Sequence, residues 1–305
     1  MRELRPCCIC GSQKGTVVFQ ATHSADLFAG SLPDPYTAHY KVNRCSGCGL
    51  QYSSPILDDD GVRALYEHGV VTKSDDSDGT NVATGESLGV QRTMQLYYER
   101  IRPFLRSKDS FMEVGCDVGY LLEVAQTDGF AQIYGCEPNP LARQRASKLR
   151  NSVISDLFYE QWELPHDHFD ALTLIHVVDH LVDPMRVLEK ARTELKAGGI
   201  LFAVVHDVEC LLARVTGERF PPFNLYHHYF FSKSTLRKLL EAAGFQVLEV
   251  KNTLNSYSVG FFLEKAPALP GKALLGRVMA KIGVAQRRVT VPIGNIGIVA
   301  RKPGA

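Results

Sequence analysis

The sequence predicts an α/β fold, a doubly wound Rossmann-like sheet that follows a small cysteine-bearing unit. From residue 110 onward, apolar runs typical of buried parallel strands alternate with amphipathic helical patterns. A glycine-containing turn at residues 115–119 separates the first of these strands from its helix. Two Cys-x-x-Cys-Gly pairs fall before that region, within residues 1–57. The large unit therefore takes up most of the chain, and the cysteines belong to a separate N-terminal element.

Composition and charge narrow the classes of function. The chain has 305 residues and a formal net charge of +1, so no bulk electrostatic attraction draws it to nucleic acid. No apolar run reaches the length of a transmembrane helix, and the first residues lack an apolar signal core. We expect a cytoplasmic protein with no integral membrane segment and no nucleic-acid partner.

Residues 1–57 carry the pattern of a zinc ribbon. Cys7 and Cys10 form one pair, Cys45 and Cys48 form the other, and a glycine follows each pair. Two cysteines three residues apart can bind one ion, and two such pairs complete a tetrahedral site with four thiolates. Such a site has no open coordination position, so the predicted zinc is structural. Cys8 is predicted to stay outside it.

Residues 58–85 are polar and aperiodic, which predicts a linker or a lid. Residues 86–106 then show apolar side chains at helical spacing, which predicts an amphipathic helix packed on the sheet. The side chains of this stripe are Val90, Met94, Tyr97, Ile101 and Phe104.

The segment from Ser110 to Pro138 reads as strand, glycine turn, helix, strand and acid. In a parallel βαβ unit this order places the turn and a helix N-terminus at the carboxyl edge of the sheet. The acid, Glu137, ends the second strand, where a carboxylate can accept hydrogen bonds from both hydroxyls of a ribose. The segment predicts a cofactor that contains a nucleoside.

Further strands and helices follow in alternation. Strands are predicted at 152–155, 169–178, 200–205, 245–250 and 296–300, and helices at 141–149, 183–195, 232–243 and 273–285. The end of the 169–178 run carries His176, Asp179 and His180. A long aromatic loop carries His227 and His228.

Four blocks of sequence resemble one known family. They are Cys45-Ser-Gly-Cys48-Gly-Leu, Glu113-Val-Gly-Cys-Asp-Val-Gly119 with Gly135-Cys-Glu137-Pro138, His180-Leu-Val-Asp-Pro184 with Leu195-Lys-Ala-Gly-Gly199, and His228-Tyr-Phe-Phe-Ser232 with Ala243-Gly244-Phe245. The chain resembles the class I S-adenosylmethionine-dependent methyltransferases that carry an N-terminal cysteine-knuckle zinc unit. The resemblance implies a seven-stranded sheet of order 3-2-1-4-5-7-6 with an antiparallel seventh strand, built from residues 86–305.

The resemblance, together with the residues themselves, assigns S-adenosylmethionine to the glycine turn. Gly115 and Gly119 allow close backbone approach, Glu113 orients the turn, and Glu137 accepts the ribose hydroxyls. Asp117 stands where the family usually has glycine, so it either crowds the cofactor or binds its ammonium group. The expected adenine contacts are Asp156 and Leu157. The simpler alternatives are a solvated strand-end acid at Glu137 and a turn acid at Asp156.

The end of the fourth strand of the sheet, residues 169–178, is where the methyl group is expected to emerge. A hydroxyl acceptor needs a base to take its proton. The predicted catalytic residues are His180, His176, Asp179 and His228. These histidines have a structural alternative, in which they only brace the strand-to-helix turn. The same four residues also resemble, in part, the metal ligands of small-RNA 2′-O-methyltransferases.

The resemblance implies a small acceptor, such as a glycan, a glycolipid or a natural product, methylated on oxygen or carbon. The rival interpretation is a binding or scaffold protein that keeps the fold and has lost turnover. The predicted basic helix at 273–285 allows peripheral membrane contact, with packing or an oligomer contact as the alternative. The sequence does not indicate an oligomeric state.

Overall fold

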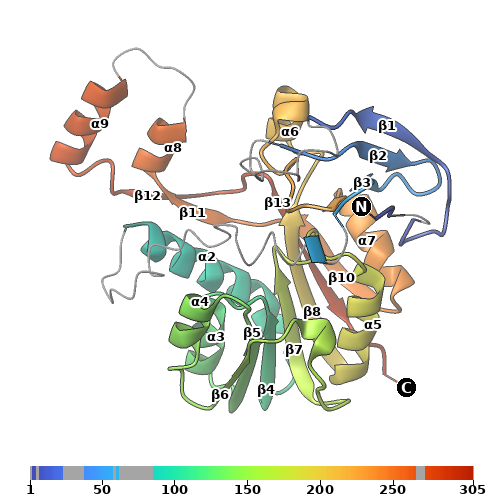
Figure 1. The fold of residues 1–305 in the computed structure, drawn as a ribbon. Helices are drawn as coiled ribbons and strands as arrows, with labels where there is room; N and C mark the ends of the chain where they lie inside the picture. The colour runs from blue at the N-terminus through green and yellow to red at the C-terminus, as the bar shows by residue number, and fades with distance from the viewer. Residues whose placement is uncertain are drawn as a thin grey trace.

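The computed structural model describes residues 2–4, 7–22, 38–57, 60–61, 85–265 and 272–304 (Figure 1). The predicted linker or lid lies almost wholly outside these residues.

A seven-stranded sheet forms the centre of the large unit, in the order β10-β13-β8-β7-β4-β5-β6. Six of its strands point in the same direction, and β13 is antiparallel to both of its neighbours. The strands are β4 (Ser110–Val114), β5 (Gln132–Cys136), β6 (Ser152–Ser155), β7 (Phe169–Ile175), β8 (Leu195–His206), β10 (Gln246–Asn252) and β13 (Asn295–Arg301). In chain order this is 3-2-1-4-5-7-6, so the predicted sheet is confirmed.

Helices cover both faces of this sheet. On one face lie α2 (Gly85–Ile101), α3 (Tyr120–Thr127) and α4 (Pro140–Ala146), and on the other lie α5 (Pro184–Glu194) and α7 (Lys233–Ala242). Successive side chains of β8 point to opposite faces of the sheet, as they do in any strand. Leu201 and Ala203 pack with α5 and α7, whereas Ile200 and Phe202 pack with α2 and α3. The sheet is therefore buried on both sides, which explains its nearly continuous apolar strands.

The helix starts follow from local chemistry. Asp183 caps α5 by accepting the backbone NH of Arg186 at 3.1 Å, and proline occupies the first helical position. Ser232 and Thr235 form a reciprocal capping box at the start of α7. These caps fix where each helix leaves the carboxyl edge of the sheet, and therefore where the preceding loop must lie.

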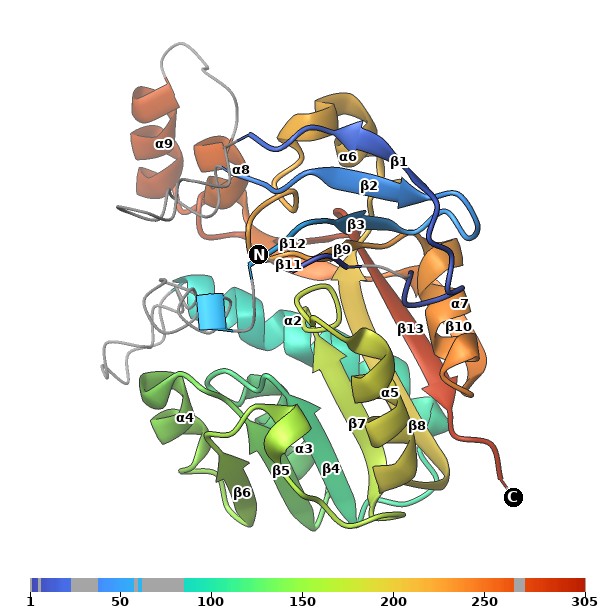
Figure 2. The same ribbon diagram turned by 45° about the vertical axis from the view of Figure 1, so that its right-hand side comes forward.

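A second sheet lies above the carboxyl ends of the parallel strands (Figures 1 and 2). Its order is β1-β2-β3-β9, built from β1 (Gly15–Phe19), β2 (Val42–Cys45), β3 (Gln51–Ser53) and β9 (Tyr229–Phe230). The last strand comes from the large unit and pairs with β3 through Gln51–Phe230 and Tyr52–Tyr229. The N-terminal unit is therefore joined by backbone hydrogen bonds to the aromatic loop at residues 220–229.

The remaining elements lie at the edges of the molecule. A two-stranded ribbon of β11 (Asn255–Ser258) and β12 (Arg288–Val291) carries α8 (Val259–Lys265) and α9 (Lys272–Lys281), which project to the upper left in Figure 1. Helix α6 (Leu211–Thr216) follows β8, and short 3-10 turns occupy Arg102–Phe104, Tyr159–Gln161 and Gly217–Arg219. Among the described residues, no helix has the length and apolar character needed to span a membrane.

Several predicted boundaries are wrong by a few residues. The run 169–178 ends as a strand at Ile175, because His176 takes a positive φ of 53° that a strand cannot continue. Val90 is 40 % exposed, so the buried stripe of α2 starts later than predicted. The strand predicted at 200–205 starts earlier, because β8 runs from Leu195 to His206 directly after α5 ends at Glu194.

Candidate active site

The glycine turn after β4 is held by backbone hydrogen bonds to the neighbouring strand. The NH groups of Gly115 and Cys116 both donate to the carbonyl of Cys136, each at 3.0 Å. Gly119 has a φ of 85° and precedes α3. A Cβ at Gly119 would lie 3.1 Å from the Cβ of Ala146 in α4, so glycine there also permits close helix packing. The turn is rigid before any ligand binds.

Asp117 keeps the backbone conformation of the glycine it replaces. Its φ is 45°, in the left-handed region, and aspartate tolerates that region better than most side chains. The departure from the family pattern therefore changes the side chain at this position without changing the path of the turn.

Glu137 is fixed between the turn and the start of α4. One carboxylate oxygen accepts the NH of Asp117 at 3.0 Å, and the other accepts the NH of Asn139 at 2.8 Å. The residue is 7 % exposed, and burial, followed by the negative charge of Asp117, raises its pKa to about 7. Each oxygen keeps a lone pair beyond these bonds, so the carboxylate can still accept from a ligand.

The three remaining predicted cofactor residues differ in their surroundings. Glu113 is buried on β4, and burial, followed by the charges of Asp117 and Glu137, raises its pKa well above its usual range. Asp156 and Leu157 are exposed just past the end of β6. Glu113 is therefore enclosed in the sheet, whereas Asp156 and Leu157 are accessible to a ligand at the sheet edge.

Four imidazoles surround one buried carboxylate at the carboxyl edge of the sheet. The loop between β7 and α5 supplies His176, Asp179 and His180, the end of β8 supplies His206, and the loop before β9 supplies His227. The ring centroids of His176 and His206 are 4.7 Å apart, and those of His180 and His227 are 4.4 Å apart. This His–Asp cluster gathers three segments that are distant in the sequence.

Asp179 lies at the centre of the His–Asp cluster. It is 2 % exposed, and neither carboxylate oxygen accepts a hydrogen bond from the described residues. The Nε2 atom of His180 lies 4.0 Å from Oδ1, and Nε2 of His227 lies 3.9 Å from Oδ2. Both distances are too long for hydrogen bonds. Burial raises the pKa of Asp179 to about 6 and lowers the pKa of His206 and of His227 to about 4.

The structure brings together three of the four predicted catalytic residues. His228 does not join them, because its Nδ1 faces the carbonyl of Leu181 at 3.4 Å and the residue is 1 % exposed. Its neighbour His227 takes that place. The sequence analysis missed His206. The available signal was its position at the carboxyl end of a predicted central strand, where side chains meet in sheets of this type.

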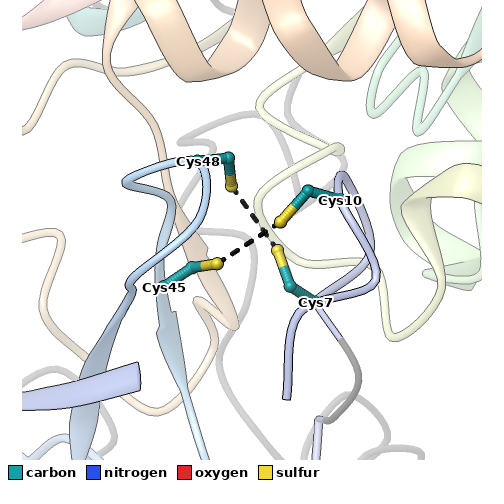
Figure 3. Close-up of side chains that lie close together, drawn as sticks. All are labelled: Cys7, Cys10, Cys45 and Cys48. Atoms are coloured by element: carbon teal, nitrogen blue, oxygen red, sulfur yellow. Dashed lines mark hydrogen bonds between the residues drawn. The ribbon is translucent and has the colours of Figure 1, made fainter. Parts of the chain in front are cut away.

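The four predicted zinc ligands form a second cluster, shown in Figure 3. The Sγ atoms of Cys7 and Cys48 are 3.6 Å apart, and those of Cys10 and Cys45 are 3.5 Å apart. Tetrahedral zinc with Zn–S bonds of about 2.3 Å places sulfur atoms about 3.8 Å apart. The spacing therefore fits one zinc ion, and the sulfur atoms need little movement to bind it.

The two clusters are connected through β3. The NH of Ser53 donates to the carbonyl of His228 at 2.8 Å, and its Oγ donates to the carbonyl of His227 at 3.3 Å. From the other side, the carbonyl of Asp179 accepts the NH groups of His228 and Tyr229. The segment that carries His227 is therefore clamped between the cysteine-bearing unit and the loop after β7.

Comparison with known proteins decides the family. The sequence model described as "Methyltransferase domain" matches residues 89–250, which is more than half of the chain. The chain belongs to this methyltransferase domain family. The match spans α3, the glycine turn, and every residue of the His–Asp cluster.

The methyltransferase also matches curated proteins over part of its length. A tRNA U34 carboxymethyltransferase of Campylobacter fetus is 28 % identical over 170 residues, which covers 51 % of this chain and 59 % of the relative. A ubiquinone biosynthesis O-methyltransferase of Actinobacillus pleuropneumoniae is 29 % identical over 101 residues, which covers 30 % of this chain and 43 % of the relative. The chain spans about half the length of the curated relatives that it matches.

Solved structures support the fold. One chain of the Haloferax volcanii complex between the Trm112 methyltransferase activator and a methyltransferase superposes with a TM-score of 0.54 at 16 % identity. The match covers 76 % of this methyltransferase and 97 % of that chain. A Bacillus halodurans methyltransferase gives a TM-score of 0.50 at 17 % identity, and the match covers 68 % of this chain and 98 % of that one.

Proposed function

We infer that this methyltransferase transfers a methyl group from S-adenosylmethionine to an oxygen or carbon atom of a small acceptor. One observation carries the proposal. A Cβ added to Gly115 would lie 2.9 Å from Cγ2 of Val177, so the loop that bears the His–Asp cluster packs directly against the glycine turn. A proton acceptor and a nucleoside-binding turn are thus neighbours at one edge of the sheet.

The residues of the turn fit the cofactor that the family implies. The carboxylate of Glu137 is held rigidly and keeps lone pairs for two ribose hydroxyls. Asp156 and Leu157 lie at the next strand end along the edge, where an adenine ring would follow a ribose.

Bound S-adenosylmethionine supplies a methyl group already activated on a sulfonium. The protein must then hold the acceptor in line, exclude water and take a proton. His180 is the proposed base, because its side chain is about one-fifth exposed while Asp179 beside it is buried. Asp179 lies 4.0 Å from its Nε2 and would stabilise the imidazolium that forms.

We also propose that the cysteine cluster binds one structural zinc ion. The four sulfur atoms satisfy the full tetrahedral coordination of zinc, which leaves no position for a substrate. The predicted role of zinc is therefore to hold the N-terminal unit in shape, and through β3 to hold the loop that carries His227.

Calorimetry with S-adenosylmethionine tests the proposed cofactor site. Glu137→Gln preserves shape and removes the charge, and hydrogen bonds to charged groups contribute about 1.5–3 kcal/mol, so the affinity should fall roughly 10- to 100-fold. Glu123→Gln, an exposed acid on α3, is the matched control and should bind like the wild type. Equal binding by all three proteins would remove Glu137 from the site.

The acceptor class is tested with methyl-labelled cofactor and three pools: phenols and other small alcohols, glycans, and bulk tRNA. The balanced charge of the chain favours the small acceptors, and so does the relative named for ubiquinone biosynthesis. Label in the tRNA pool alone would move the proposal to nucleic acid, in line with the relatives named for tRNA U34.

A further inference from the structure

The carboxylate of Asp179 is buried, and the imidazoles nearest to it in the described structure lie farther away than a hydrogen bond allows. No hydrogen bond reaches either oxygen from the described residues, and the Nε2 atoms of His180 and His227 lie 4.0 Å and 3.9 Å from the nearest oxygen. A buried charge without a partner is strongly unfavourable. In the described part of the chain, the side chains within ion-pair distance of Asp179 are the imidazoles of His180 and His227, at 4.0 Å and 3.9 Å.

One side of this carboxylate has the donor set of a metal site. One donor atom from each of His176, Asp179 and His206 lies within 4.8 Å of the other two. The Nδ1 atom of His176 is buried and has no hydrogen-bond partner in the described part of the chain. Ligands of a single ion are about 3–4 Å apart when each bond is near 2.1 Å, so small side-chain movements would close the site.

One ring nitrogen of His206 is held by a hydrogen bond, as is usual for histidines that bind a metal through the other nitrogen. Its Nδ1 lies 2.9 Å from Oδ1 of Asn295, and the Nδ2 of that amide faces Oδ1 of Asn255 at 3.4 Å. An amide oxygen can only accept, so Nδ1 carries the proton and Nε2 keeps a lone pair. A second partner that fixes the tautomer in this way is typical of imidazole ligands.

We propose that His176, Asp179 and His206 bind one divalent transition-metal ion next to the proposed base. Two imidazoles and one carboxylate suit zinc, iron, cobalt or nickel, and three protein ligands leave positions open. An acceptor oxygen bound there would lose its proton more readily to His180. The proposal rests on the proposed function for its role in catalysis, and it names the acceptor class as an alcohol or phenol whose oxygen can bind a metal.

Cobalt(II) titration of the full chain, after removal of metal with a chelator, tests this without any activity assay. Thiolate-bound cobalt gives an intense near-ultraviolet charge-transfer band, whereas cobalt bound by imidazole and carboxylate gives only weaker visible bands. We expect two ions per chain at equilibrium, one with each signature. A single ion with the thiolate signature would overturn the proposal, and this result needs no variant.

Variants then locate the second ion. Asp179→Asn and His206→Gln should lose it and keep the thiolate band, which also reports an intact fold of the N-terminal unit. His228→Gln, a buried histidine outside the cluster, and His180→Gln should keep both ions. Survival of the second ion in Asp179→Asn, or its equal loss in His180→Gln, would contradict the assigned ligands. Normal S-adenosylmethionine binding in the same samples separates a failure of this site from a failure of the proposed function.

Discussion

The cysteine cluster and the His–Asp cluster look alike in outline and differ in construction. The four cysteine sulfur atoms lie within 4.8 Å of one another, and the His–Asp cluster contains two sets of three donor atoms, sharing Asp179, that meet the same limit. The cysteines come from two short turns of one small unit, and four thiolates can satisfy one ion completely. The His–Asp cluster draws on three distant segments, and among the described residues its carboxylate accepts no hydrogen bond. The first arrangement suits a structural role, and the second suits chemistry.

Strand β3 connects the cysteine cluster to the His–Asp cluster. β3 leads directly out of the second cysteine pair and hydrogen-bonds to the segment that carries His227. The cysteine cluster can therefore affect catalysis only by positioning, while the His–Asp cluster acts on the reacting groups. The following predictions separate these two roles, beginning with the largest expected effect.

Asp179→Asn should lower methyl transfer by about 10²- to 10⁴-fold, the usual contribution of acid–base machinery. The affinity for S-adenosylmethionine should change less than about twofold on the proposed assignment, since the carboxylate that holds the cofactor is Glu137. Initial rates with labelled cofactor and calorimetry measure the two quantities. Asp207→Asn, another buried acid that follows β8 and accepts the NH of Glu209, is the control and should stay active.

Cys45→Ser should act on stability instead. Loss of one thiolate weakens a structural zinc site that contributes to folding outright, so we expect a cost on the order of 4 kcal/mol. This corresponds to a fall of roughly 10 °C in the melting temperature, measured by calorimetric unfolding. Cys8→Ser, beside the cluster but outside it, should change the melting temperature far less. Equal effects of the two substitutions would show that zinc is not what holds this unit.

The cofactor site should respond to pH through Glu137. Its pKa is raised to about 7 in the folded protein, so the carboxylate is ionised above that pH and protonated below it. The ionised form accepts the ribose hydroxyls, and affinity should therefore fall as pH drops below about 7, approaching tenfold per pH unit. Calorimetry between pH 8 and pH 6 measures this. Glu137→Gln should bind weakly at both values, and an equal slope in that variant would assign the dependence to another group.

Ser53→Ala tests the connection itself. It removes one hydrogen bond to the carbonyl of His227, with an expected cost of about 1 kcal/mol. Nuclear magnetic resonance of the histidine side chains should show His227 shifted while the signals of the cysteine-bearing unit stay in place. Ser46→Ala, exposed on the second knuckle, should leave His227 unchanged. An unmoved His227 in both variants would mean that β3 does not position this residue.

The smallest effect is expected for Asp117→Gly. The backbone at this position already has a glycine-like φ of 45°, so the substitution removes a side chain without moving the turn. Cofactor affinity should stay within about threefold of the wild type. The substitution neither adds nor removes a hydrogen bond to a charged group in the turn, and such a bond would contribute about 1.5 kcal/mol or more. A large gain in affinity would instead support the interpretation that Asp117 had impaired the site.

The sequence predicted the cysteine cluster fully and the His–Asp cluster only in part. The cysteine ligands lie in two pairs with fixed spacing, and the geometry is local, so the pattern alone specifies the site. His206 and His227 join Asp179 through the order of strands β7 and β8 and the pairing of β9 with β3. These are long-range contacts with no local signature. His228 was predicted in place of His227 because the direction of each ring is set by contacts with Leu181 and Pro222.

The same limit applied to the fold. Alternating strands and helices predicted the doubly wound class of the main sheet, and the family resemblance implied its strand order. By contrast, β9 is two residues long and pairs with β3. The strand after Phe169 was predicted too long, since its apolar letters continue past the positive φ of His176. Backbone strain at a single residue leaves no trace in a hydropathy pattern.

A crystal structure of the full chain with S-adenosylhomocysteine tests the central claim most directly. The account predicts that the ribose hydroxyls contact Glu137 and that the thioether sulfur faces the His–Asp cluster across Gly115 and Val177. The cysteine cluster should hold zinc and should not touch the ligand. A sulfur that points away from Asp179 and His180, with the acceptor side of the ligand open elsewhere, would contradict the account.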